Sequence, residues 1–345
     1  MEKTNLKGLD LAELDKWISS ISEKPFRARQ IYKWMYAKNV CSFAEMSNLS
    51  GDLRKKLAEI VDLSQLEIQD KRESCQDDSV KYLFRLKDGH AVEAVYLVAG
   101  RRVTVCLSTM VGCPVACPYC ATGMMGFKRN LTAGEIIDQL LLIQSDLNIR
   151  ATNIVFMGMG EPFLNYDNVI KTAGILNSEL GPEIAARRIT ISTAGIIPQI
   201  RRFTDEGHRY KLAVSLNGTT EFQRDELVPI NRKYPLRELL PAIHHYTKQS
   251  RRRVTFEYIL IAGYNDSAAD ARRLVKMLAQ IPCKVNLIPY NETEFLPYRA
   301  PSEDQLNRFL QQLYRAPFAV TVRRSKGQDI AAACGQLYVQ ADRSS

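Results

Sequence analysis

The sequence predicts an α/β protein built on a partial barrel, and three observations carry this prediction. From residue 103 onward, apolar runs rich in β-branched residues alternate six times with amphipathic helical runs, a pattern typical of parallel strands joined by crossover helices. A helical stretch opens the chain, and a pair of strands separates it from the repeats. We therefore expect a partial (β/α)6 barrel with a small helical N-terminal domain and a β-strand extension.

The first two segments of the chain precede the barrel. Residues 1–62 are expected to form a helical accessory domain: LKGLDLAELDKWISSI and FRARQIYKWMYAK carry apolar residues at helical spacing, and DLRKKLAEIV follows a break at residues 49–51. Residues 63–102 are expected to form a β linker. In it, VKYLFRLKDG and HAVEAVYLVAG make two strands joined by a turn at residues 87–89.

The core, residues 103–345, contains the repeated strand–helix units. Seven strands are predicted, and a helical run follows each of the first six. The strands are residues 103–109, 152–158, 188–194, 212–218, 254–263, 284–290 and 318–324. In barrel-like α/β folds the chemistry lies at the carboxyl ends of the strands. Functional residues are therefore expected directly after these runs.

Composition and charge narrow the classes of function. The hydrophobic content of 46% and the charged content of 25% are ordinary for a globular protein. The formal net charge of +9 favours a polyanionic partner such as nucleic acid. No stretch approaches 18 continuous apolar residues and the N-terminus lacks the apolar core of a secretory signal, so we expect no membrane partner and a cytoplasmic location. Basic clusters suited to phosphate contacts occur at residues 101–102, 128–129, 187–188, 201–202, 251–253 and 323–324.

The segment GCPVACPYCATG holds three cysteines, Cys113, Cys117 and Cys120, with the spacing CxxxCxxC. Clustered thiols in a reducing compartment more often bind metal than form disulfides. Structural zinc is one interpretation, but it requires four protein ligands, and the four histidines are remote in sequence. An iron–sulfur cluster held by three thiolates instead leaves one iron open to a substrate or cofactor. We favour the cluster and keep zinc as the alternative.

This loop resembles that of the radical S-adenosylmethionine (SAM) superfamily, because CxxxCxxC follows the first barrel strand and Tyr119 directly precedes the last cysteine. The resemblance implies a 4Fe-4S cluster whose open iron binds SAM and whose electron cleaves it to a 5′-deoxyadenosyl radical. The segment GMGEP, residues 158–162, follows the second strand. Its glycines permit close backbone approach, and the carboxylate of Glu161 can meet the ammonium group of SAM.

Six motifs together resemble the RlmN/Cfr family of radical SAM methyltransferases, which act on adenosine in RNA. In chain order they are CLSTMVGCPVACPYCATGMMGFKRNLTAGEI, FMGMGEP, RRITISTAG, LVPINRKYP, KVNLIPYN and DIAAACGQL. The resemblance spans essentially the whole chain and implies that residues 1–62 bind RNA. It implies methylation of carbon 2 of an adenosine in the peptidyl-transferase centre of 23S rRNA, and of one in the tRNA anticodon loop. It also implies an electron donor of the flavodoxin or ferredoxin type. Methylation of carbon 8 of the same rRNA adenosine, in the resistance branch of the family, is the alternative.

The resemblance assigns catalytic roles to Cys334, Cys106 and Glu93. Cys334 takes a methyl group from one SAM, and the radical derived from a second SAM removes a hydrogen from that methyl group, so two SAM molecules serve each turnover. The resulting carbon radical adds to the adenine, Glu93 accepts the ring proton, and Cys106 forms a disulfide with Cys334 to release the RNA. The attacked carbon is electrophilic, so direct methyl transfer from SAM would fail, whereas a radical on a tethered carbon can add to it.

The family motifs also place a set of residues around SAM: Gly160, Glu161, Ser192, Ser215, Leu216, Asn217 and Asn291. One of them departs from the family, which usually has histidine at the position of Asn217. Asparagine keeps one hydrogen bond but cannot become charged near neutral pH. Two other classes of protein stay open: a non-enzymatic RNA-binding protein with a structural metal, and a radical SAM enzyme acting on a protein or small molecule. The pair Cys106 and Cys334 argues against the second of these.

Overall fold

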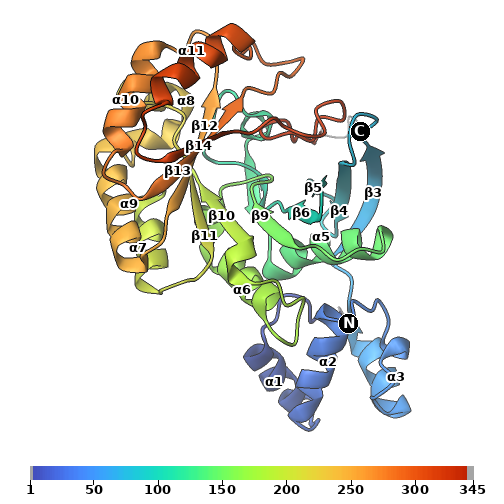
Figure 1. Cartoon of the computed structure of the whole chain (residues 1–345). Coiled ribbons are helices and arrows are strands. Elements are labelled where there is room, and N and C mark those ends of the chain that lie inside the picture. The colour runs from blue at the N-terminus through green and yellow to red at the C-terminus, as the bar shows by residue number, and fades with distance from the viewer. Residues whose placement is uncertain (1–2, 340–345) are drawn as a thin grey trace.

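A sheet of ten strands forms the body of the protein in the computed structural model, which describes residues 3–339 (Figure 1). The strand order is β14-β13-β12-β11-β10-β9-β6-β5-β4-β3, and the strands from β6 to β14 in this order run parallel. The parallel strands are β6 Arg102–Cys106, β9 Asn153–Phe156, β10 Ile189–Thr193, β11 Lys211–Ser215, β12 Val254–Leu260, β13 Cys283–Pro289 and β14 Ala319–Val322. The predicted α/β fold with a partial barrel is confirmed.

Helices cover one face of the parallel strands, which we call the outer face (Figure 1). They are α5 Ala133–Asp146, α6 Tyr166–Asn177, α7 Ile197–Asp205, α8 Glu221–Leu227, α9 Leu236–Ser250, α10 Ala268–Leu278 and α11 Glu303–Leu313. Short 3-10 turns precede α6, β10 and α9: they are η2 Pro162–Asn165, η3 Ala186–Arg188 and η4 Pro229–Arg232. Helix α5 begins with a capping box between Thr132 and Glu135, which satisfies the free N–H groups of its first turn.

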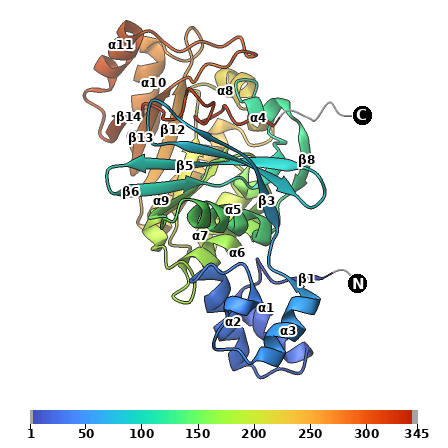
Figure 2. The same cartoon turned by 90° about the vertical axis from the view of Figure 1, so that its right-hand side faces the viewer.

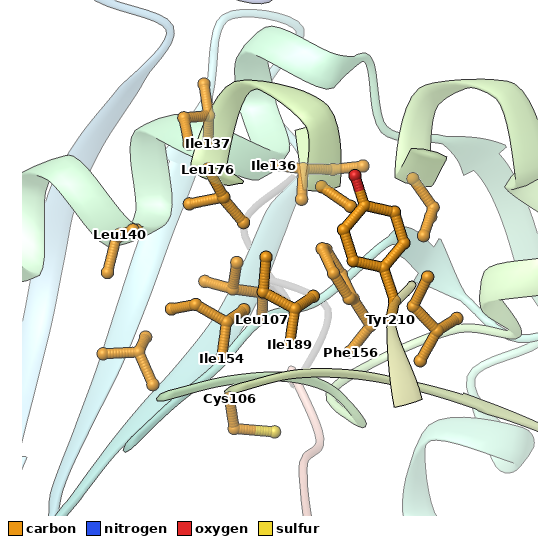
Figure 3. Packing of buried hydrophobic residues seen from close by; sticks show 14 of the residues in the cluster. Cys106, Leu107, Ile136, Ile137, Leu140, Ile154, Phe156, Leu176, Ile189 and Tyr210 are labelled. Carbon is orange, nitrogen blue, oxygen red and sulfur yellow. The ribbon is translucent and has the colours of Figure 1, made fainter. Parts of the chain in front are cut away.

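The opposite, inner face of the parallel strands is more polar. In β11, Leu212 and Val214 belong to the hydrophobic core, whereas Lys211 and Ser215 alternate with them and so point inward. Cys106 ends β6 and lies on the other side of the strands from core residues such as Ile154 and Phe156 (Figure 3). The two faces of one sheet therefore have separate tasks: the outer face holds the helices, and the inner face is free for chemistry.

The β extension continues the same sheet with antiparallel strands. The two predicted strands are β4 Val80–Leu86 and β5 Ala91–Ala99. A third strand, β3 Leu66–Glu73, was not predicted as a separate element, because its sequence LEIQDKRE is polar and largely exposed. It lies at the edge of the sheet, where charged residues are common since one side of the strand has no partner.

The N-terminal helices α1 Leu11–Ser20, α2 Phe26–Tyr36 and α3 Gly51–Ile60, with the turn η1 Phe43–Glu45, gather at one end of the molecule (Figure 2). The prediction of an entirely helical segment misses a short parallel pair, β1 Thr4–Asn5 with β2 Val61–Asp62. Two residues are too few for a periodic sequence signal, and their pairing joins positions far apart in the chain. No helix within residues 3–339 is long and apolar enough to cross a membrane.

A buried ion pair fastens the N-terminal segment to the core. The ammonium of Lys7 pairs with the carboxylate of Asp138 on α5, and the other oxygen of Asp138 accepts hydrogen bonds from the backbone N–H groups of Gln65 and Leu66. Next to this pair the backbones touch: a Cβ atom on Gly8 would lie 2.3 Å from the backbone nitrogen of Gly134. The contact between the N-terminal segment and α5 therefore depends both on glycine at position 8 and on the ion pair of Lys7 with Asp138.

We predict that Asp138→Leu lowers the free energy of unfolding by about 3–5 kcal/mol, because the ammonium of Lys7 and two N–H groups would stay buried without a partner. Denaturant unfolding followed by circular dichroism measures this loss. The matched control is Glu303→Gln, which breaks the exposed pair with Arg324 and should change stability by less than about 1 kcal/mol. Equal effects of the two substitutions would contradict the anchoring role of Asp138.

Candidate active site

The cysteine loop is closed at its base by a two-stranded hairpin, β7 Met110–Gly112 with β8 Phe127–Asn130, and contains the short helix α4 Ala121–Met124. A Cβ atom on Gly112 would lie 1.7 Å from the carbonyl oxygen of Gly126, so only glycine lets the two strands meet here. Inside the loop, the N–H of Cys120 donates to the carbonyl of Cys117 at 3.1 Å. The hairpin thus presents all three cysteines from one closed loop beside the end of β6.

The three thiols lie in one apolar environment, which also contains Val115 and Tyr119. Burial raises the pKa of Cys113 to about 12, and repulsion from Cys120 adds to this effect. The same causes raise the pKa of Cys117. Within residues 3–339, no three His, Cys, Asp or Glu side chains gather closely enough to hold a single metal ion.

Three neighbouring thiols fit an iron–sulfur cluster. Soft thiolates are the ligands that such clusters require, and iron replaces the proton on each sulfur, which removes the cost of burying a free thiolate. The residues that would hold the cluster are Cys113, Cys117 and Cys120, and the apolar side chains around them would limit access of water.

The GMGEP segment follows β9 and lies against the start of the cysteine loop. A Cβ atom on Gly158 would lie 2.6 Å from the hydroxyl of Ser108, and one on Gly160, which has φ +103°, would lie 2.6 Å from Cβ of Met110. The carboxylate of Glu161 is buried and accepts hydrogen bonds from the N–H groups of Phe163 at 3.0 Å and Ala194 at 2.7 Å. Burial raises the pKa of Glu161 to about 7, and these bonds oppose the rise. This carboxylate therefore joins the end of β9 to the end of β10.

The predicted SAM residues from the next strands lie at or near their carboxyl ends. Ser192 is on the inner face of β10, Ser215 ends β11, and Leu216 and Asn217 follow it. Asn217 has a left-handed backbone with φ +51°, which asparagine tolerates better than most residues. Its Nδ2 donates to the hydroxyl of Tyr119 at 2.6 Å, and its Oδ1 accepts from the N–H of Ile259 at 2.9 Å. Asn217 thereby connects the cysteine loop with β12.

Arg224 on α8 is a buried arginine that the sequence analysis missed. Its guanidinium, 0% exposed, donates to the carbonyl oxygens of Ser215 at 2.8 Å and Ala194 at 2.8 Å, and to Oδ1 of Asn231 at 2.9 Å. Burial lowers the pKa of Arg224 to about 10. Its position just after the Ser-Leu-Asn segment was the available signal, but any helix-surface arginine would look the same in sequence. Arg224 holds the ends of β10 and β11 in register with each other.

The segment after β14, residues 327–339, which we call the carrier segment, crosses the concave side of the sheet (Figure 1). Its backbone binds the cysteine loop directly: the N–H of Ala121 donates to the carbonyl of Gly335 at 2.8 Å, and the hydroxyl of Thr122 donates to that of Leu337 at 2.7 Å. Nδ2 of Asn291 donates to the carbonyl of Cys334 at 3.0 Å. These bonds bring Cys334, from the end of the chain, to the cysteine loop.

Cys106 and Cys334 lie near each other and near Arg323. Burial raises the pKa of Cys106 to about 12, and the charge of Cys334 adds to the rise. The charge of Cys334 in turn raises the pKa of Arg323, with contributions from Glu257 and Cys106, while burial opposes it. All eight cysteines of the chain are free thiols in this structure. The sequence placed Cys106 and Cys334 in one reaction by resemblance alone, and in the fold the charge of Cys334 acts on Cys106.

Glu93 on β5 is buried and engaged at both carboxylate oxygens. Oε1 pairs with the ammonium of Lys81 at 2.8 Å, and Oε2 accepts from the N–H of Tyr338 at 2.9 Å. Lys81 also donates to the carbonyl of Ala331 at 3.3 Å. Burial raises the pKa of Glu93, and Lys81 opposes the rise. The β extension thus meets the carrier segment through Glu93 and through Lys81, a residue that the sequence analysis did not single out.

Comparison with known proteins defines the class. The Radical SAM superfamily model matches residues 107–275, which include the cysteine loop and the strands from β9 to β12. The protein is therefore a radical SAM enzyme. Membership of this superfamily implies an iron–sulfur cluster and SAM as cofactors.

Relatives over the whole chain define the family. The model for the ribosomal RNA large subunit methyltransferase N-terminal domain matches residues 4–63. The dual-specificity RNA methyltransferase RlmN of Geobacter sulfurreducens is 46% identical over 96% of this chain and 91% of its own length, and that of Syntrophobacter fumaroxidans is 45% identical over 99% of both. A crystal structure of a radical SAM methyltransferase from Sphaerobacter thermophilus matches with a TM-score of 0.93 and 44% identity over 97% of this chain and 99% of that one. The chain belongs to the RlmN family of radical SAM RNA methyltransferases, which confirms the resemblance.

We predict that changing Cys113, Cys117 or Cys120 to alanine lowers bound iron from about four atoms per chain to below about one, because two thiolates hold a cluster poorly. Iron and sulfide analysis of the anaerobically reconstituted protein measures this. The control is Cys283→Ala, a buried cysteine at the start of β13, which should keep its iron. Wild-type iron content in all three variants would reject the site.

Proposed function

We propose that this protein methylates carbon 2 of an adenosine in 23S rRNA and of one in tRNA. The observation that carries the proposal is the set of bonds made by the carrier segment: it binds the cysteine loop through Ala121 and Thr122, and Glu93 through Tyr338. A cluster loop, a thiol carrier and a carboxylate thus surround one place on the inner face. The two RlmN relatives are named dual-specificity RNA methyltransferases, which supports two kinds of RNA substrate.

The cofactors of the proposal are one 4Fe-4S cluster on Cys113, Cys117 and Cys120, and two SAM molecules per turnover. When bound, they supply a methyl group and the radical that activates it. The residues proposed to hold SAM are Gly160, Glu161, Ser192, Ser215, Leu216, Asn217 and Asn291. Several of them also brace the site: Glu161 bonds to Ala194, and Asn291 bonds to the carbonyl of Cys334. SAM would therefore be held by groups that are already fixed in position.

In this proposal Cys334 carries the methyl group and Cys106 resolves the adduct. The carrier thiol is half-buried, whereas Cys106 is buried, so the carrier is the more accessible of the two to a substrate. The positive charge of Arg323 opposes the rise that burial causes in the pKa of Cys106. The thiolate is the nucleophile in both methyl capture and disulfide formation. The disulfide that Cys106 forms with Cys334 is reduced again before the next turnover.

Glu93 is proposed to accept the ring proton from the adenine. Burial alone would favour its neutral form, and the ammonium of Lys81 at 2.8 Å opposes this, so that the carboxylate can act as a base. Taking the proton weakens the ion pair with Lys81, because the acid no longer carries a charge. Glu93 also binds Tyr338 in the carrier segment, which keeps the base next to the carrier thiol.

The remaining parts of the proposal concern partners and organisation. Residues 1–62 would bind RNA as an accessory domain, residues 63–102 would link it to the catalytic core, and residues 103–345 would form that core. The ion pair of Lys7 with Asp138 supports a rigid connection between residues 1–62 and the core. A flavodoxin or ferredoxin would supply electrons, and the protein would act in the cytoplasm, where its RNA substrates are found.

The direct test of the proposed function is nucleoside mass spectrometry after anaerobic reaction of the iron-loaded protein with SAM, a reductant, and fragments of rRNA or tRNA. We expect 2-methyladenosine from both RNAs. 8-Methyladenosine would move the protein to the resistance branch of the family. No methyladenosine from a protein with a full cluster that cleaves SAM would refute an RNA adenosine substrate.

We predict that Cys334→Ala lowers product formation at least about 10³-fold, since no other group can take the methyl. Cys106→Ala should instead accumulate a covalent protein–RNA adduct, because nothing displaces the RNA from Cys334. Denaturing gel electrophoresis with labelled RNA detects this adduct. Cys41→Ala, which changes an exposed cysteine far from β6 in the chain, should behave as the wild type. Free turnover by Cys106→Ala would contradict its resolving role.

A further inference from the structure

A row of polar side chains crosses the inner face of four adjacent parallel strands. Strand register places Ser215 of β11 beside Glu257 of β12, Glu257 beside Asn286 of β13, and Asn286 beside Thr321 of β14. The neighbours of these residues along each strand, such as Phe256 and Tyr258, belong to the hydrophobic core on the outer face. The polar row therefore faces the same side as Cys106.

Hydrogen bonds along this row run in one direction and stop at Glu257. The hydroxyl of Thr321 donates to Oδ1 of Asn286 at 2.6 Å, and Nδ2 of Asn286 donates to Oε1 of Glu257 at 2.9 Å. The other carboxylate oxygen, Oε2, is buried and has no hydrogen-bond partner. Glu257 as a whole is 7% exposed. Because a buried carboxylate oxygen without a donor is costly, its persistence points to a donor that arrives with a ligand.

Arg323 connects Glu257 electrostatically with the two cysteines proposed to react. The guanidinium of Arg323 lies near enough to Glu257, Cys334 and Cys106 for the charge of each to act on it. Among residues 3–339, no side chain donates a hydrogen bond to Oε2 of Glu257, so Arg323 does not occupy this oxygen. Burial raises the pKa of Glu257, with Arg323 and Asn286 opposing the rise. A ligand donor would act in the same direction as these two residues.

We propose that Oε2 of Glu257 accepts a hydrogen bond from the exocyclic amino group of the target adenine, and that this contact selects adenine among purines. The inference rests on the proposed function and identifies the group of the adenine that the site recognises, its exocyclic amine. An adenine base offers one N–H donor group, this amine, and the carbon attached to Cys334 brings the ring to the inner face. A carboxylate is the natural acceptor for such a group.

Glu257 lies level with the first of the β11 residues proposed to hold SAM, because strand register places Ser215 beside it. The backbone N–H of Leu216 donates to the carbonyl of Glu257 at 2.9 Å, so Leu216 lies level with it, while Asn217 bonds to Ile259 two residues further along β12. β12 itself continues to Leu260. Glu257 thus projects from within the strand, three residues before its end and beside Ser215.

The test compares two RNA substrates with two enzymes, so that intrinsic differences between the substrates cancel. One hairpin carries adenosine at the target position, and the other carries purine riboside, which lacks only the amine. For the iron-loaded wild type, we expect kcat/KM to be about 10- to 100-fold lower with purine riboside. For Glu257→Ala, we expect the adenosine value to fall by a similar factor and the preference for adenosine to shrink to about twofold or less.

Further variants separate recognition from folding. Glu257→Gln keeps an oxygen acceptor and the shape of the side chain, so it should retain part of the preference for adenosine. Thr255→Val changes a buried residue on the same face of β12, two positions earlier, and should leave the preference unchanged. Iron content and SAM affinity, measured for each variant, should equal those of the wild type.

Several results would overturn the inference. Full preference for adenosine in Glu257→Ala would show that another group reads the amine, and a loss of SAM affinity without a change in preference would assign Glu257 to the cofactor. A wild type with an intact cluster that makes no methyladenosine would contradict the proposed function instead. If Glu257→Ala fails to fold, the same comparison with Glu257→Gln decides, because an unchanged preference and an unchanged rate in that variant would reject the charged contact.

Discussion

The hydrogen bonds between the carrier segment and the cysteine loop are the contacts on which the rest of the site depends. Ala121 and Thr122, which directly follow Cys120, bind the backbone carbonyls of Gly335 and Leu337, which follow Cys334 in the chain. They hold Cys334, which lies more than two hundred residues after the cysteine loop in the chain, beside that loop. Because these are bonds to backbone atoms, they fix the path of the segment whatever the state of the carrier thiol. Glu93 and Asn291 then add contacts from two further elements.

The parallel sheet supplies the frame in which this docking can occur. Parallel strands carry their carboxyl ends to one edge, where the GMGEP segment, Ser215 and Asn217 meet the cysteine loop. Glu161 and Arg224 tie these ends together through backbone groups. Burial of Arg224 and of the Glu161 carboxylate is tolerated because each makes hydrogen bonds with backbone groups of neighbouring strand ends. Glu161, which we propose contacts SAM, therefore also helps to hold the strand ends in register, together with Arg224.

The inner face of the sheet also holds two buried carboxylates, those of Glu93 and Glu257. Lys81 satisfies one oxygen of Glu93, and Tyr338 satisfies the other. Glu257 differs, because Asn286 satisfies one oxygen and the second has no donor. Two buried carboxylates on one face thus differ in their hydrogen bonding, and this difference underlies the two roles that we propose for them: Glu93 takes a proton, and Glu257 accepts a hydrogen bond from the substrate.

The sequence by itself determined the order of the seven parallel strands and of the longer helices between them, because each of these elements carries its own period of apolar residues. It also determined the cysteine loop and the GMGEP segment, since ligand spacing and glycine content are local. It missed the strands β1, β2, β3, β7 and β8 and the helices α4 and α8. These elements are short or polar, and the strands form only with their pairing partners. Only the tertiary structure decided that Lys81 meets Glu93, that Arg224 supports two strand ends, and that Glu257 keeps a free oxygen. These contacts depend on which residues, distant in the chain, are buried next to one another. The sequence around a single lysine, arginine or glutamate does not indicate its partner in the fold.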